Sequence, residues 1–142
     1  MSALETLIRL HRWQLDERRR YLAGLDALAA RLRADAQRLR DEADEEARAA
    51  GLSLDAASAY PGFIRSLIER RREIERSIAE VDTQVVEASD AVAVAFQEVN
   101  RYELAAAHRE REARRRVARR EQRDEDALAL QVHRRTRNDR TG

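Results

Sequence analysis

The sequence predicts an all-α protein in which two long helices form an antiparallel coiled-coil hairpin with an overhanging C-terminal helix. Three observations support this prediction. Charged residues make up 39% of the 142 residues, and aromatic residues only 4%. Apolar residues recur at alternating steps of four and three in two long stretches, which is typical of a coiled coil. The only proline, Pro61, and two glycines, Gly51 and Gly62, lie between these stretches and mark the one strong helix break.

The first helix is expected from about residue 3 to residue 50. Its seam, the line of positions at steps of four and three, is apolar at eleven of fourteen places. These places are Leu4, Ile8, His11, Leu15, Arg18, Leu22, Leu25, Ala29, Leu32, Ala36, Leu39, Ala43, Glu46 and Ala50. Such a stripe needs a partner surface to cover it.

The second helix is expected from about 63 to 135, after a loop at about 51–62 and before a tail at 136–142. The seam resumes with Arg71 as its only charged member. Its positions are Ile64, Leu67, Arg71, Ile74, Ile78, Val81, Val85, Ala88, Val92, Ala95, Val99, Tyr102 and Ala106. We therefore expect residues 1–142 to form a single coiled-coil domain.

A loop of about a dozen residues lets the chain reverse, so each stripe can cover the other within one chain. This interpretation predicts a monomer near 16.4 kDa. We favour a register in which opposed residue numbers sum to about 117, because Glu46 then meets Arg71. A sum near 110 would set Arg71 against Leu39 and leave a charge unpaired. In the favoured register, the chain beyond roughly residue 114 overhangs the hairpin.

Charge divides the chain unevenly. All 28 cationic side chains are Arg; residues 1–110 carry a net charge of −4 and residues 111–142 a net charge of +5. The segment Arg111–Arg123 holds seven Arg and two Glu, and could bind an acidic surface or phosphates. A solvated helix extension is the alternative. No aromatic side chains are interleaved for base stacking, so nucleic acid is not expected as a partner.

No chemistry-bearing motif indicates an enzyme. The chain has no Cys, and His11, His108 and His133 are too dispersed to suggest a metal cluster. We find no phosphate-binding loop and no nucleophile beside a base. We therefore expect no catalytic, cofactor or metal site. No apolar run is long enough for a bilayer span or a signal core, so we expect an untargeted, cytoplasmic protein.

Aromatic residues are few, yet Tyr60 and Phe63 follow one another closely at the loop-proximal start of the second helix, with Ile64 beside them. One interpretation is a hydrophobic plug that closes the end of the hairpin. The other is a partner-binding tip.

The layout resembles that of the FliJ family, small coiled-coil components of the bacterial flagellar type III export apparatus. The most specific similarity is the loop Ala50-Gly-Leu-Ser-Leu followed by Tyr60-Pro-Gly-Phe63-Ile64-Arg-Ser-Leu67. The charged stretch from Arg120 to Glu125 is also similar to the family's C-terminal region. Pro61 within the motif is a departure from the family's pattern.

The resemblance implies a non-enzymatic stalk, similar to the central subunit of rotary ATPases, whose open end enters the ring of the export ATPase FliI and promotes its assembly and activity. We assign the ring contact to Arg114, Arg115, Arg119 and Arg120, because Arg pairs readily with carboxylates.

The resemblance also implies contact with the export-gate protein FlhA, at the membrane periphery, and handling of export chaperones. Phe63 and Leu67, with Tyr60, match the second-helix side of the family's gate-binding patch. On the first helix, the aligned stretch Ala29–Arg40 lacks the family's tyrosines.

Two alternatives stay open at this point. The chain could be the related stalk of a virulence type III secretion system, or a generic scaffold in which two chains dimerise.

Overall fold

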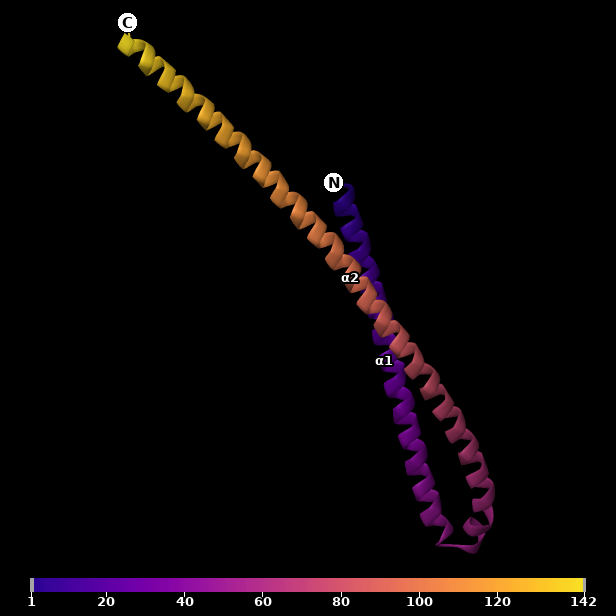
Figure 1. Cartoon of the computed structure of the whole chain (residues 1–142). Coiled ribbons are helices and arrows are strands. Elements are labelled where there is room, and N and C mark those ends of the chain that lie inside the picture. Colours follow the sequence, from indigo (N-terminus) through magenta and orange to yellow (C-terminus); the bar gives the residue numbers. More distant parts are fainter. Residues whose placement is uncertain (1, 142) are drawn as a thin grey trace. The chain divides into compact units, whose positions relative to one another are not determined.

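The computed structural model describes residues 2–141, and within them the chain consists of two long α-helices without any strand. Helix α1 covers Ala3–Ala50 and helix α2 covers Leu54–Thr141 (Figure 1). The predicted all-α class is therefore confirmed. Neither helix has a stretch long and apolar enough to cross a membrane.

Reciprocal hydrogen bonds mark the start of α1. The amide of Glu5 donates to the Ser2 hydroxyl at 3.2 Å, and the Ser2 amide donates to the Glu5 carboxylate, also at 3.2 Å. This is a capping box, which satisfies amides that have no partner inside the helix. At the other end, the amide of Gly51 donates to the carbonyl of Arg48 at 3.2 Å and closes the last turn.

The start of α2 corrects our expectation. The break is confined to residues 51–53, whereas we expected a loop at 51–62 and a helix from about 63. Ser53 caps the new start, because its hydroxyl accepts the amide of Ala56 at 3.1 Å.

Pro61 lies inside α2 and does not end it. Proline lacks an N–H, so the carbonyl of Ala57 loses its partner four residues along. Ala57 is exposed, so water can bind this carbonyl and the helix continues through the proline.

The end of α2 also differs from the expected tail at 136–142. The helix continues to Thr141, and the hydroxyls of Thr136 and Thr141 donate to the carbonyls of Val132 and Arg137 at 2.9 and 3.2 Å. No Gly or Pro interrupts this stretch before residue 142. The helix pattern therefore has nothing to stop it.

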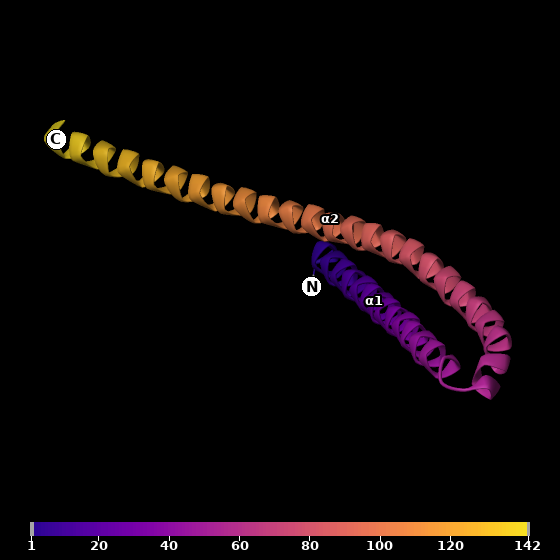
Figure 2. The same cartoon turned by 90° about the horizontal axis from the view of Figure 1, so that it is seen from below.

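The chain forms two compact units. The first unit is Leu10–Gln97, and the second unit includes residues 2–9 and 98–141 of the described chain. In the first unit α1 and α2 lie side by side (Figures 1 and 2). The buried side chains there are Leu15, Leu25, Ala29 and Leu39 of α1 and Leu67, Val81, Ala88 and Ala95 of α2. All eight are predicted seam positions, so the periodicity identified the core.

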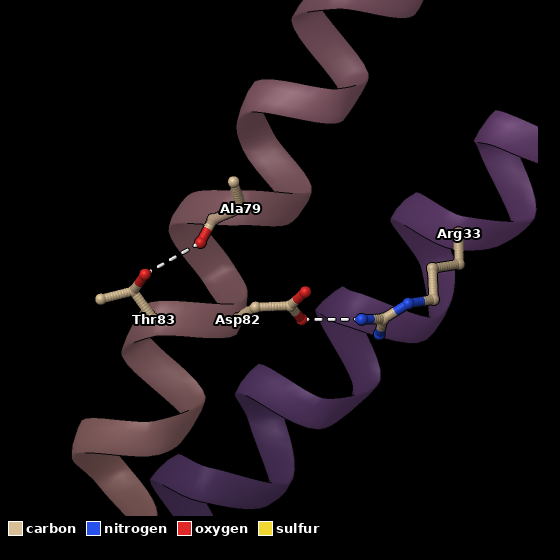
Figure 3. A network of polar contacts seen from close by, with 4 residues as sticks. All are labelled: Arg33, Ala79, Asp82 and Thr83. Atoms are coloured by element: carbon tan, nitrogen blue, oxygen red, sulfur yellow. Dashed lines mark hydrogen bonds and ion pairs between the residues drawn. The ribbon is translucent and has the colours of Figure 1, made fainter.

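Two ion pairs join the helices of this unit. Figure 3 shows Arg33 of α1 meeting Asp82 of α2, and the distance from Arg33 Nη2 to Asp82 Oδ1 is 2.7 Å. In the second pair, Arg70 Nη2 lies 3.3 Å from Glu42 Oε2. In Figure 3 the Thr83 hydroxyl donates along α2 itself, to the Ala79 carbonyl at 3.1 Å. From the first pair to the second, the residue number rises on α1, from Arg33 to Glu42, and falls on α2, from Asp82 to Arg70. All four charged side chains are about half exposed, so each pair stabilises the contact by about 0.2–1 kcal/mol.

The register differs from the one we favoured. Arg33 and Asp82 have numbers that sum to 115, and Glu42 and Arg70 numbers that sum to 112, both below 117. Arg71 accordingly pairs along its own helix, with Nε 2.9 Å from Glu75 Oε1, and its side chain is 67% exposed. The Arg71 guanidinium is solvated at the edge of the seam, so it does not need an acidic partner on α1.

The second unit has a small core and a long exposed segment. Ile8 and Val99, both seam positions, are 8% and 7% exposed. Every residue from Ala113 to Thr141 is exposed. This segment is held by its own backbone hydrogen bonds and by ion pairs along the helix, which are individually weak.

Candidate partner-binding surfaces

Three of the predicted site residues lie on one face near the start of α2. Tyr60, Phe63 and Leu67 follow one another at steps of three and four, which brings them onto neighbouring turns. Tyr60 and Phe63 are half-buried, whereas Leu67 is only 9% exposed. The two aromatic side chains therefore keep part of their surface exposed, whereas Leu67 belongs to the core.

A groove in the Leu10–Gln97 unit continues from Leu67. It is lined by Ala36, Leu39, Arg40, Ala43 and Asp44 of α1 and by Leu67, Arg71, Glu75 and Ile78 of α2. Five of these nine side chains are apolar and four are charged. We call this the turn-proximal groove. An apolar floor with a charged rim is the usual composition of a surface that receives another protein.

The turn exposes two leucines that sequence reasoning did not assign to a site. Leu52 and Leu54 are 86% and 90% exposed, the highest values of any large apolar side chain in residues 2–141. Both flank the capping residue Ser53, whose hydrogen bond fixes the turn between them. The signal in the sequence is the Leu-Ser-Leu order around the capping serine, with Leu52 in the break and Leu54 as the first residue of α2.

The four predicted arginines are exposed but do not share a face. At about 100° per residue, Arg114, Arg115, Arg119 and Arg120 spread over roughly two-thirds of the circumference of α2. Arg114 Nη2 lies 2.6 Å from Glu110 and Arg115 Nη1 lies 3.1 Å from Glu112, both along the helix.

Arg119 and Arg120 form no ion pair with any residue that the structure describes. The arrangement presents positive charge in several directions at once. It can therefore meet carboxylates on several sides without a fixed rotational setting.

The described residues contain no group of three or more His, Cys, Asp or Glu side chains that could hold a metal ion. Nor do they contain a buried side-chain nitrogen or oxygen that lacks a hydrogen-bond partner. The surfaces just described combine exposed apolar and charged side chains, a composition that is common in protein–protein contacts.

Comparison with known proteins gives one finding that covers nearly the whole chain. A family model described as flagellar FliJ protein matches residues 1–138. No curated protein and no solved structure matches the chain.

Proposed function

Because the chain belongs to the family of flagellar FliJ proteins, a family of non-enzymatic type III export components, we propose that it is the stalk of the export apparatus. In this role it binds the ring of the export ATPase, promotes ring assembly and ATP hydrolysis, and links the ring to the export gate. The exposed, Arg-rich end of α2 is the observation that carries the proposal. It offers charge to an enclosing partner in several directions, as a stalk inside a ring requires.

The proposed stalk is an antiparallel coiled-coil hairpin with an overhanging C-terminal helix. The ion pairs Arg33–Asp82 and Glu42–Arg70 support it, because both join the two helices of a single chain with opposite numbering. The unbroken exposure of residues 113–141 supports the overhang. A hairpin closed within one chain is monomeric, which distinguishes it from a scaffold made of two paired chains.

The ATPase contact is assigned to Arg114, Arg115, Arg119 and Arg120. Each is exposed, so little desolvation precedes its binding. Acidic side chains on an enclosing ring would form charge-assisted hydrogen bonds with the guanidinium groups, and such bonds are about twice as strong as neutral ones.

The gate contact is assigned to Tyr60, Phe63 and Leu67, with the turn-proximal groove beside them. The half-exposed aromatic side chains support this assignment, because aromatic residues dominate binding hot spots. Leu52 and Leu54 extend the apolar surface at the turn. Gate binding places the protein at the cytoplasmic periphery of the membrane, where export chaperones are further partners.

ATP hydrolysis by the export ATPase of the same organism tests the ring contact. We expect the full chain to stimulate hydrolysis, and the variant with Arg114, Arg115, Arg119 and Arg120 all changed to Gln to lose this effect. A matched control changes Arg18, Arg19, Arg20 and Arg31 of α1 to Gln, which removes the same charge from exposed positions elsewhere. Equal stimulation by both variants would move the contact away from the C-terminal segment, and no stimulation by any chain, with ring assembly verified, would refute the stalk.

Binding to the purified cytoplasmic part of the gate protein tests the second contact. Phe63→Ala is expected to weaken binding at least tenfold, since it removes one of the two half-exposed aromatic side chains of the patch. Val117→Ala, which shortens an exposed apolar side chain in the other unit, is the control. Unchanged affinity of Phe63→Ala would favour the alternative that these aromatic residues only close the end of the hairpin.

A further inference from the structure

A second groove lies farther from the turn, in the Leu10–Gln97 unit. It is lined by Glu17, Arg18 and Tyr21 of α1 and by Gln84, Glu87, Ala88 and Ala91 of α2. The alanines Ala88 and Ala91 line its floor, and the seam positions on either side of Ala88, Val85 and Val92, carry larger side chains. Small floor residues leave room between the helices. We call this recess the Tyr21 groove.

Large apolar side chains stand exposed around the groove. Tyr21 is 62% exposed and lines the groove itself. Val94 is 58% exposed and follows Ala91 by three residues, so it lies on the same side of α2. Aromatic and aliphatic side chains around a small-residue floor form the kind of surface that receives an apolar helix stripe.

Gly24 is a second feature of the surface near the groove, although it does not line the groove itself. It lies three residues after Tyr21, in the middle of α1, where glycine is less favourable than alanine. A Cβ built at this position would meet nothing within 4 Å. Packing within the chain therefore does not require a glycine here. A flat spot beside an exposed aromatic ring allows the backbone of a second helix to come near.

The charge along α2 indicates the chemistry of that helix. Residues 77–97 contain four acidic side chains and no basic one, in a chain that has 28 arginines. Glu87, on the edge of the groove, takes part in no ion pair with the residues that the structure describes. On the α1 side, Glu17 already pairs with Arg20 at 2.7 Å, and Arg18 also lines the groove. Within the described residues, the groove thus has an unpaired carboxylate on its α2 edge, at Glu87, and an unpaired guanidinium on its α1 edge, at Arg18.

We propose that the Tyr21 groove is a docking site for an amphipathic helix of a partner protein. This helix has an apolar stripe that enters the groove, and it carries basic side chains along the edge of the stripe that lies next to α2. Tyr21 packs against the apolar stripe, Gly24 admits the partner backbone, and Glu87 pairs with the basic edge. The three helices then form a short bundle over this part of the hairpin. The site is separate from the residues assigned above to the ATPase and the gate.

The direct test uses two synthetic helical peptides with the same Leu and Ala stripe. One has Lys along one edge of the stripe, and the other has Glu at the same positions. The probe is the fluorescence of Trp13, the only tryptophan, which lies on α1 two turns before Tyr21 and is 60% exposed. We expect the Lys peptide to bind the full-length protein at least tenfold more tightly than the Glu peptide. Equal affinity for both would overturn the proposed chemistry.

Two glycine variants separate docking from stability. Gly24→Ala is expected to raise the melting temperature, since alanine favours a helix. It is also expected to weaken binding of the Lys peptide at least fivefold. Gly62→Ala is the matched control, because Gly62 also lies inside a helix with nothing within 4 Å of its Cβ. It should stabilise the protein and leave peptide affinity unchanged. Unchanged affinity of Gly24→Ala would remove the argument for close approach.

A further pair of measurements identifies the occupant. Tyr21→Ala should lose peptide binding with an unchanged melting temperature, because the side chain is exposed. Light scattering of the protein alone should give the monomer mass. A dimer that Tyr21→Ala converts to monomer would show that a second copy of this chain fills the groove, and would overturn the proposed partner. None of these measurements includes the export ATPase, so they are independent of the stalk proposal.

Discussion

Replacing Leu39 by alanine tests the core that the seam forms. Leu39 is 4% exposed, the lowest value of any leucine in the described chain. A buried Leu→Ala change costs about 2–5 kcal/mol, through lost burial and the cavity that remains. Leu39 also lines the turn-proximal groove, where solvent can enter the space, so we expect a loss near the lower end, at about 2–3 kcal/mol.

Urea unfolding of the full chain, followed by circular dichroism at the helix band, measures this loss. With a slope of about 1–3 kcal/mol per molar urea, the midpoint should fall by about 0.7–3 M. Leu52→Ala is the control, because it makes the same chemical change at a side chain that is 86% exposed, and it should shift the midpoint by less than about 0.3 M. Equal shifts for the two variants would refute the assignment of the core.

Three further changes address local features. Arg33→Ala should cost only about 0.2–1 kcal/mol, because its pair with Asp82 is half exposed; a larger loss in a double-mutant cycle would mean that the pair is coupled to the core. Pro61→Ala should raise the unfolding free energy by about 1–2 kcal/mol, since it restores a hydrogen bond to the Ala57 carbonyl, and a lower value would show that the proline is needed. Ser2→Ala should lower the free energy of unfolding by about 1 kcal/mol, because it removes the helix cap, and the hydrogen-exchange rate of the Glu5 amide should rise. An unchanged exchange rate would show that the cap does not stabilise the helix.

Seam periodicity predicted the core well because burial in a pair of helices depends on one repeating stripe. All ten residues that are buried within residues 2–141 lie on the predicted seam, including Ile8 and Val99 of the second unit. The charged seam members Arg18, Glu46 and Arg71 are exposed instead. Long side chains at a narrow interface reach water by turning outward, so a charge in the pattern does not imply a buried pair.

Register and boundaries were harder to predict because the competing energies are small. A seam of similar apolar residues repeats every seven positions, so several registers bury nearly the same surface. The choice among them depends on exposed ion pairs such as Arg70–Glu42, each worth less than about 1 kcal/mol. Pro61 and Gly62 indicated a break, yet the cap at Ser53 lets the helix begin earlier and the proline removes only one hydrogen bond.

The candidate sites were predictable as residue types but not as arrangements. The Arg-rich segment is evident from composition, whereas its spread around the helix follows from continuous helical geometry through Arg120. The exposure of Leu52 and Leu54 depends on a three-residue turn that the Pro-Gly signal obscured. For the Tyr21 groove, the seam pattern indicated that Ala88 faces α1, but it did not indicate that a recess lies beside this alanine.

The exposed segment from Ala113 to Thr141 also determines how fast this end of α2 responds to a partner. Because every residue of this segment is exposed in the described structure, we expect its relaxation to be that of an isolated helix, which for about 20 residues takes roughly 0.1–1 μs. Encounters between proteins at cellular concentrations are much less frequent. Between encounters, the segment therefore interconverts many times between frayed and fully helical states. Diffusion and electrostatic attraction then set the association rate, because no slow conformational opening precedes binding.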